Sequence, residues 1–112
     1  MTNKVITEVV VPLLEREFDV NETMKVLTYN QRTFWSWGVS KRMNVLNKGL
    51  LLRVNGRHHK GDVLITLGWD DTYTVRIMKT SGKIVDTYTM VYFDLLTEII
   101  DNRIERIPEY VR

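Results

Sequence analysis

Two pairs of adjacent residues are the candidates for enzyme chemistry in this sequence, Asp70-Asp71 and His58-His59. The aspartates could form a carboxylate pair for catalysis, but they stand in a short link between two apolar segments, where aspartate is favoured because it forms turns. The histidines could bind a metal, yet neighbouring side chains on an extended chain point in opposite directions. Only Asp62 offers a third ligand nearby. We therefore expect neither a catalytic pair nor a metal site.

Motifs that bind cofactors or create a nucleophile are missing from the sequence. No dinucleotide fingerprint, phosphate-binding loop or nucleophile elbow appears, and Gly56 and Gly61 flank a loop between expected strands rather than starting a helix. Cysteine is also absent, which excludes disulfides, thiolate nucleophiles and cysteine zinc sites and is typical of intracellular proteins. We expect a cytoplasmic protein that is not an enzyme and that uses no cofactor.

A stretch rich in aromatic and basic residues, from residue 29 to residue 42, carries the most specific functional indication. Aromatic rings stack on the bases of single-stranded nucleic acid, while lysine and arginine neutralise its phosphates. The competing interpretation places Trp35 and Trp37 in the core, with the basic residues as a solvated rim. A second basic group at a loop tip would add phosphate contacts. The residues predicted to contact nucleic acid or another partner are Arg32, Phe34, Trp35, Trp37, Lys41, Arg42, Arg57, His58, His59 and Lys60.

Charge is unevenly distributed along the chain, although the formal net charge is only +2. Residues 23–61 carry eight basic residues and no acid, whereas residues 62–112 carry nine acids against six bases. We expect one side of the domain to be basic, which concerns partners rather than fold. The acidic outer face of the last predicted helix is solvated, pairs with the basic face of a second copy, or occupies a nucleic-acid site on a host protein.

Alternation of apolar and polar residues predicts an antiparallel sheet. Its centre is a hairpin over residues 61–79, in which two alternating segments flank a turn at residues 69–72. Further strands are expected at residues 34–39, 50–54 and 84–87. Apolar side chains on the outer face of these strands need a cover, either from the N-terminal helix or from another subunit, as in a homodimer. The outward residues are Leu51, Leu64 and Met78.

Apolar residues at helical spacing predict three helical segments. The first covers residues 6–18, and Pro12 either kinks it or lets it begin only near Val11. Asn21 is expected to cap a second, shorter helix. Thr87 or Thr89 is expected to cap the last helix, which Pro108 ends; its apolar stripe consists of Tyr92, Leu95, Leu96, Ile99, Ile100, Arg103, Ile104 and Ile107.

These elements together predict one domain, residues 1–112, of the α+β class. The predicted architecture is an antiparallel sheet of four or five strands, with an N-terminal helical segment and a C-terminal amphipathic helix packed on it. The longest apolar run, residues 9–14, is far shorter than the ~20 residues that a membrane-spanning helix needs. We therefore expect no membrane association.

Part of the sequence resembles a group of small uncharacterised proteins encoded by bacteriophages and prophages. The resemblance rests on Ile65-Thr66-Leu67, residues 71–75, Gly82, Val91-Tyr92 and Leu95-Leu96, and extends over roughly residues 23–105. It implies a phage-borne protein and brings no activity, cofactor or site with it.

The sequence thus favours a non-enzymatic binding module, phage-encoded, that contacts nucleic acid through a basic face rich in aromatic residues. The alternative is a protein-interaction factor, such as an inhibitor of a host enzyme or a small phage assembly component. In that case Trp35, Trp37 and Arg32 would anchor a protein interface, as tryptophan and arginine often do.

Overall fold

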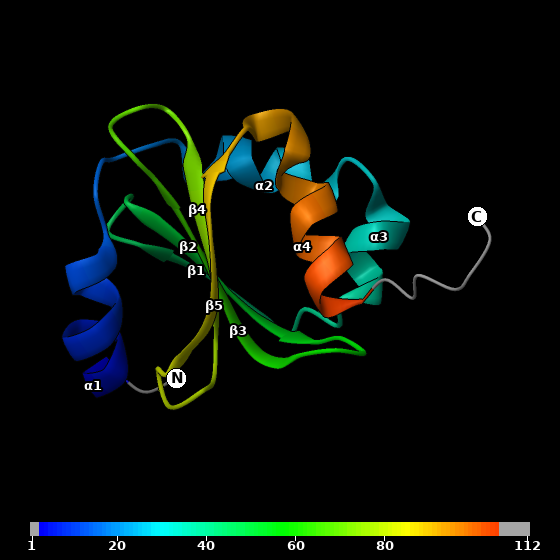
Figure 1. The fold of residues 1–112 in the computed structure, drawn as a ribbon, viewed down its shortest axis with the longest axis horizontal. Helices are drawn as coiled ribbons and strands as arrows, with labels where there is room; N and C mark the ends of the chain where they lie inside the picture. Colours follow the sequence, from blue (N-terminus) through cyan, green and yellow to red (C-terminus); the bar gives the residue numbers. More distant parts are fainter. Residues whose placement is uncertain (1–2, 106–112) are drawn as a thin grey trace.

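A five-stranded antiparallel sheet separates two helical layers in the computed structural model, which describes residues 3–105 (Figure 1). Strands that follow one another in the sequence are neighbours in the sheet, in the order β1-β2-β3-β4-β5. The prediction of an α+β fold built on an antiparallel sheet is confirmed. The strands are β1 (Lys41–Val45), β2 (Gly49–Asn55), β3 (Lys60–Leu67), β4 (Tyr73–Met78) and β5 (Ile84–Val91).

One face of the sheet is covered by the N-terminal helical segment, which changes pitch along its length. It consists of α1 (Asn3–Val5), a π-helical turn η1 (Ile6–Val10) and a 3₁₀ turn η2 (Val11–Leu13). The wide π turn precedes Pro12, whose ring and missing N–H are incompatible with a regular helical turn. Pro12 therefore lies in the last turn of a helix that begins before Val11 and ends at Leu13.

The apolar outer face expected on the strands exists and lies under this N-terminal segment. Leu51, Leu64 and Met78 are buried there together with Val10 and Val45. Leu51 and Leu64 are directly opposite each other in the β2–β3 ladder, so they present one continuous apolar surface. The protein's own helix thus supplies the cover for this face.

The opposite face of the sheet carries a layer of short helices. These are α2 (Val20–Thr28), α3 (Gln31–Ser36), the 3₁₀ turn η3 (Phe93–Leu95) and α4 (Leu96–Ile104). Asp19 caps α2, because its carboxylate accepts hydrogen bonds from the backbone N–H groups of Asn21 (3.0 Å) and Glu22 (3.2 Å). The prediction that Asn21 is the cap was wrong by two residues. Within residues 3–105, no helix is both long enough and apolar enough to cross a bilayer.

The last helix begins later than the sequence predicts. Neither Thr87 nor Thr89 caps it, because β5 continues through both residues and pairs Val91 with Tyr73 of β4. Backbone pairing to a neighbouring strand thus overrides a local capping preference.

The inner stripe predicted for this helix is confirmed only in its central part. Leu96, Ile100 and Ile104 are buried, whereas Tyr92 and Leu95 are exposed. Ile107 of this stripe and Pro108, which is predicted to end the helix, lie outside the described residues.

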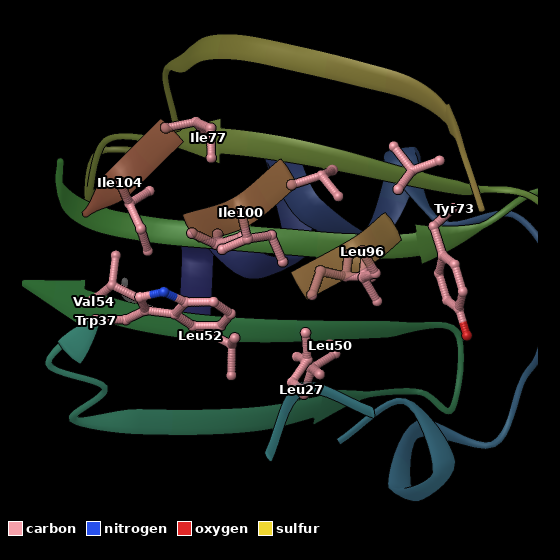
Figure 2. Close-up of a cluster of buried hydrophobic side chains, with 14 of the residues drawn as sticks. Leu27, Trp37, Leu50, Leu52, Val54, Tyr73, Ile77, Leu96, Ile100 and Ile104 are labelled. Carbon is pink, nitrogen blue, oxygen red and sulfur yellow. The ribbon is translucent and has the colours of Figure 1, made fainter. Parts of the chain in front are cut away.

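The main core lies between the sheet and this helical layer (Figure 2). Figure 2 shows apolar side chains of β2 and β4 meeting those of α4, with the Trp37 ring beside Leu52 and Val54. At one end of the core, the hydroxyls of Tyr73 and Thr23 form a hydrogen bond of 2.9 Å, so that both buried polar groups have a partner.

Truncation of a valine should distinguish this core from the edge of the sheet. We expect Val75→Ala, which empties a fully buried position, to lower the free energy of unfolding by about 2 kcal/mol. The matched variant Val85→Ala, at a 43% exposed position of β5, should cost under about 0.5 kcal/mol. Urea denaturation of both variants measures the difference, and equal losses would contradict the placement of Val75 in the core.

Candidate nucleic-acid interface

The aromatic stretch at residues 34–39 does not form the predicted strand. Residues 31–36 form α3, whose first turn is capped by Asn30: its side-chain oxygen accepts a hydrogen bond from the backbone N–H of Thr33 (3.2 Å). After α3 the chain turns at Gly38, which has a φ of +62° and whose Cβ, if present, would lie 3.0 Å from the carbonyl oxygen of Asn55. Glycine at this position lets the chain leave the helix and enter β1.

The tryptophans of this stretch have opposite environments. Trp37 is fully buried, and its indole N–H donates a hydrogen bond to Asp101 Oδ1 (3.0 Å). Phe34 is also buried, with its ring centroid 5.5 Å from that of Trp37. Trp35, in contrast, is 73% exposed. Of the three aromatic residues predicted to contact a partner, only Trp35 offers its ring to solvent.

Two arginines lie next to Trp35. Arg32 precedes it by three residues on α3, a spacing that places both side chains on one helical face. The guanidinium of Arg42 in β1 lies over the ring of Phe34, 5.7 Å from its centroid. Within residues 3–105, neither arginine forms an ion pair with a carboxylate. Both charges are therefore available to an anionic ligand.

A hollow of about 260 Å³ lies between α3 and the start of β1. Phe34, Trp35 and Arg42 line it together with Gly38 and Val39. We call the surface formed by Arg32, Phe34, Trp35 and Arg42, with this hollow, the Trp35–Arg42 site.

Lys41 belongs to the other face of the sheet, although it is adjacent to Arg42. In the β1–β2 ladder Lys41 is opposite Arg53, and Arg42 is opposite Leu52. Successive side chains of a strand point to opposite faces. Lys41 accordingly lines a small pocket with Arg53 and Asp62, beneath the N-terminal helix.

The basic loop between β2 and β3 packs against the end of α4. The backbone N–H of Arg57 donates to Glu105 Oε2 (2.8 Å), and its side-chain Nε lies 3.4 Å from Glu105 Oε1. The backbone N–H of His58 donates to the carbonyl of Ile104 (2.9 Å). Arg57 is therefore already neutralised, in contrast to Arg32.

The remaining predicted residues of this loop differ in exposure. His59 is half-buried, and its Nε2 lies 3.1 Å from the carbonyl oxygen of Met78. Lys60 is exposed at the start of β3. Among the described residues, no three His, Cys, Asp or Glu side chains come together as a possible metal site. The ten predicted contact residues thus do not form one surface. Arg32, Phe34, Trp35 and Arg42 come together, with Phe34 itself buried, and the others are buried, paired or elsewhere.

Three exposed aromatic residues outside the ten predicted contact residues line two further hollows. Tyr29 (93% exposed) and Phe93 line a hollow of about 490 Å³ between α2 and η3. Trp69 (77% exposed) lines a hollow beside the β3–β4 turn. Phe93 lies outside the apolar stripe predicted for the last helix, and Trp69 lies in a predicted turn. The sequence pattern therefore indicated that both side chains are exposed.

No protein-family model matches the chain, and searches of curated proteins and of solved structures found no match either. The geometry of the chain itself is therefore the basis for a functional proposal.

Proposed function

We propose that this protein is a non-enzymatic module that binds single-stranded nucleic acid through the Trp35–Arg42 site. The observation that carries the proposal is an exposed tryptophan flanked by two arginines that have no carboxylate partner within residues 3–105. An aromatic ring exposed to this extent costs solvation free energy unless a ligand covers it. A nucleobase is a suitable cover, because every base has a flat face that stacks on an aromatic ring.

The geometry around Trp35 suits one nucleotide. A base stacked on the indole would enter the hollow of about 260 Å³, which is smaller than most pockets for drug-sized ligands. The flanking phosphates would then lie near Arg32 and Arg42. Contact with the Phe34 ring restricts the Arg42 side chain before binding, which lowers the entropic cost of the phosphate contact.

Salt dependence tests the proposal. For a single strand, log K falls with log salt by about 0.7 per phosphate that releases its counterions. Arg32→Gln and Arg42→Gln should each reduce this slope by about 0.7. Trp35→Ala should lose about 1–3 kcal/mol of binding free energy without changing the slope, since stacking releases no counterions. Fluorescence anisotropy with a labelled oligothymidylate at several salt concentrations measures both quantities.

Arg57→Gln is the matched control for these arginine variants. Arg57 belongs to the same acid-free segment of the sequence but is paired with Glu105. Its removal should leave the salt slope unchanged. If the salt slope changes with Arg57→Gln but not with Arg42→Gln, the phosphate contact lies at the β2–β3 loop and not at the Trp35–Arg42 site. Absence of binding even at low salt would refute the nucleic-acid proposal.

A protein partner is the second candidate, favoured by the hollow between α2 and η3. Tyr29 and Phe93 expose aromatic surface there, and charges of both signs, from Lys25 and Asp94, line the same hollow. Exposed aromatic residues in a concave surface are typical anchors of protein interfaces. For this candidate, a partner retained in a pull-down should be lost with Phe93→Ala and kept with Trp35→Ala. Phage origin, and a role as a host-enzyme inhibitor or an assembly component, stay predictions.

A further inference from the structure

A polar hollow of about 280 Å³ lies beside the β3–β4 turn. The turn itself is at the top left of Figure 1. The hollow lies on the face of the sheet that carries the N-terminal segment, because Thr74 shares that face with Met78 of the same strand. The chain after the N-terminal helix passes its edge, where the backbone N–H of Arg16 donates to the carbonyl of Leu67. The residues that matter for its chemistry are Glu15, Trp69, Asp70, Thr72, Thr74 and Thr89.

Hydrogen bonds within the β3–β4 turn define its shape. The backbone N–H of Gly68 donates to the carbonyl of Thr72 (2.9 Å), which closes the turn. Asp70 Oδ1 accepts hydrogen bonds from the backbone N–H (3.0 Å) and the hydroxyl (2.7 Å) of Thr72. These hydrogen bonds lower the pKa of Asp70 below its ordinary value. Asp70 is therefore an ionised acceptor, and Trp69 stands beside it with its ring in solvent.

Gly68 creates the space between the two carboxylates of the hollow. A Cβ at this position would lie 3.1 Å from Asp70 Oδ1, closer than most side-chain contacts in proteins, and 3.4 Å from Glu15 Oε2, an ordinary contact distance. The carboxylates of Glu15 and Asp70, from two segments far apart in the sequence, thus both lie near the position that a Cβ of Gly68 would occupy. A ligand between them meets acceptors on two sides.

Hydroxyl groups complete the lining. Thr74 is only 9% exposed, and within residues 3–105 its hydroxyl makes no hydrogen bond to another residue. Thr89 of β5 lines the hollow from the edge strand. Arg76, whose charge interacts with that of Glu15, donates to Thr66 Oγ1 and does not line the hollow. The hollow therefore offers carboxylates that only accept hydrogen bonds and hydroxyls that donate or accept them.

These groups define the chemistry of a ligand. Two ionised carboxylates favour a ligand with several O–H or N–H donors and repel a phosphate chain. The threonine hydroxyls favour a ligand that also accepts hydrogen bonds. The face of an indole ring carries partial negative charge and attracts C–H groups, which are slightly positive. A pyranose ring combines these properties, because its rim carries hydroxyls and its face carries C–H groups.

We propose that the hollow at the β3–β4 turn binds one pyranose unit of a carbohydrate, with its C–H face on Trp69 and its hydroxyls on Asp70, Glu15 and Thr74. A volume of about 280 Å³ accommodates a single ring and not a folded oligosaccharide. The site is separate from the Trp35–Arg42 site and opposite to it in charge. It does not depend on nucleic-acid binding.

Saturation-transfer NMR with free monosaccharides tests the site. Glucose, galactose, mannose and N-acetylglucosamine are each added in excess to the full chain, without nucleic acid, and affinity is measured by titration. At least one sugar should receive saturation at its ring C–H protons. Trp69→Ala should weaken its binding by about tenfold or more, and Asp70→Asn should weaken it severalfold. Because both side chains are exposed, circular dichroism should show unchanged folding of these variants.

Two controls make the result specific. Trp35→Ala removes the exposed tryptophan of the Trp35–Arg42 site and should leave sugar binding unchanged. Asp71→Asn changes the neighbouring turn carboxylate, which pairs with Arg16, and asparagine tolerates the φ of +65° found there. Absence of saturation transfer to all four sugars would refute the proposal. Sugar binding that survives Trp69→Ala would also refute it. Ethylammonium serves as a simple cation probe: if it binds and no sugar does, the hollow is a cation site and the proposal is refuted.

Discussion

Replacement of Trp37 by alanine is expected to lower the free energy of unfolding by about 3–5 kcal/mol, the range found for large aromatic residues removed from cores. The Trp37 side chain is fully buried against the ring of Phe34 and the side chains of β2. Its removal creates a cavity that short helices on a sheet cannot close without losing other contacts. The substitution also removes the hydrogen bond of 3.0 Å that Asp101 Oδ1 accepts from the indole N–H.

Trp35→Ala is the matched control, because the two tryptophans are two residues apart and differ mainly in burial. At 73% exposure, Trp35 should contribute under about 1 kcal/mol to stability. Urea denaturation followed by circular dichroism measures both variants without depending on tryptophan fluorescence. Similar losses for the two variants would contradict the assignment of Trp37 to the core and Trp35 to the surface.

The central hairpin was predictable because its determinants are local. In β3 and β4 the core-facing apolar residues stand at every second position, as Val63 and Ile65 do in β3 and Val75 and Ile77 do in β4, and the turn between the strands contains the aspartates that turns favour. The outer apolar face was predictable for the same reason, since alternation assigns Leu51 and Leu64 to the face opposite the main core. That face had two possible covers, and only the packed structure identifies the N-terminal helix as the cover.

The segment at residues 34–39 was assigned wrongly because its pattern fits two periods. Trp35 and Trp37 alternate as in a strand, while Phe34 and Trp37 are three apart as on a helix. The cap at Asn30 and the positive φ at Gly38 decide for the helix. The strand at residues 41–45 was missed because four of its five residues are exposed, so it has little apolar periodicity.

The composition of the candidate site was only partly predictable. Arg57 pairs with Glu105 across 48 residues of sequence, and no local pattern reveals such a contact. Lys41 and Arg42 are adjacent in the sequence, but their separation onto two faces follows only once β1 is known to be a strand. Burial of Phe34 depends likewise on which side of α3 meets the sheet.

Arg53→Met is expected to lower the free energy of unfolding by about 3 kcal/mol, the second large effect that the structure predicts. The Asp62 side chain is 2% exposed, and its Oδ1 lies 3.1 Å from Arg53 Nε. Its Oδ2 is buried and has no hydrogen-bond partner among the described residues. Loss of Arg53 would thus leave a buried carboxylate without its cation, which costs more free energy than the pair itself contributes.

The double variant Arg53→Met/Asp62→Leu separates the unpaired charge from simple loss of packing. Because it removes both charges and keeps apolar volume, it should recover most of the lost stability or exceed that of the unmodified protein. Arg103→Met is the control for a pair near the surface: Asp86, its partner, is 47% exposed, so the loss should stay under about 1 kcal/mol. Urea denaturation at neutral pH compares the three variants. If the double variant is as unstable as Arg53→Met alone, the stability lost in the single variant comes from lost packing of the arginine stem and not from the unpaired charge of Asp62.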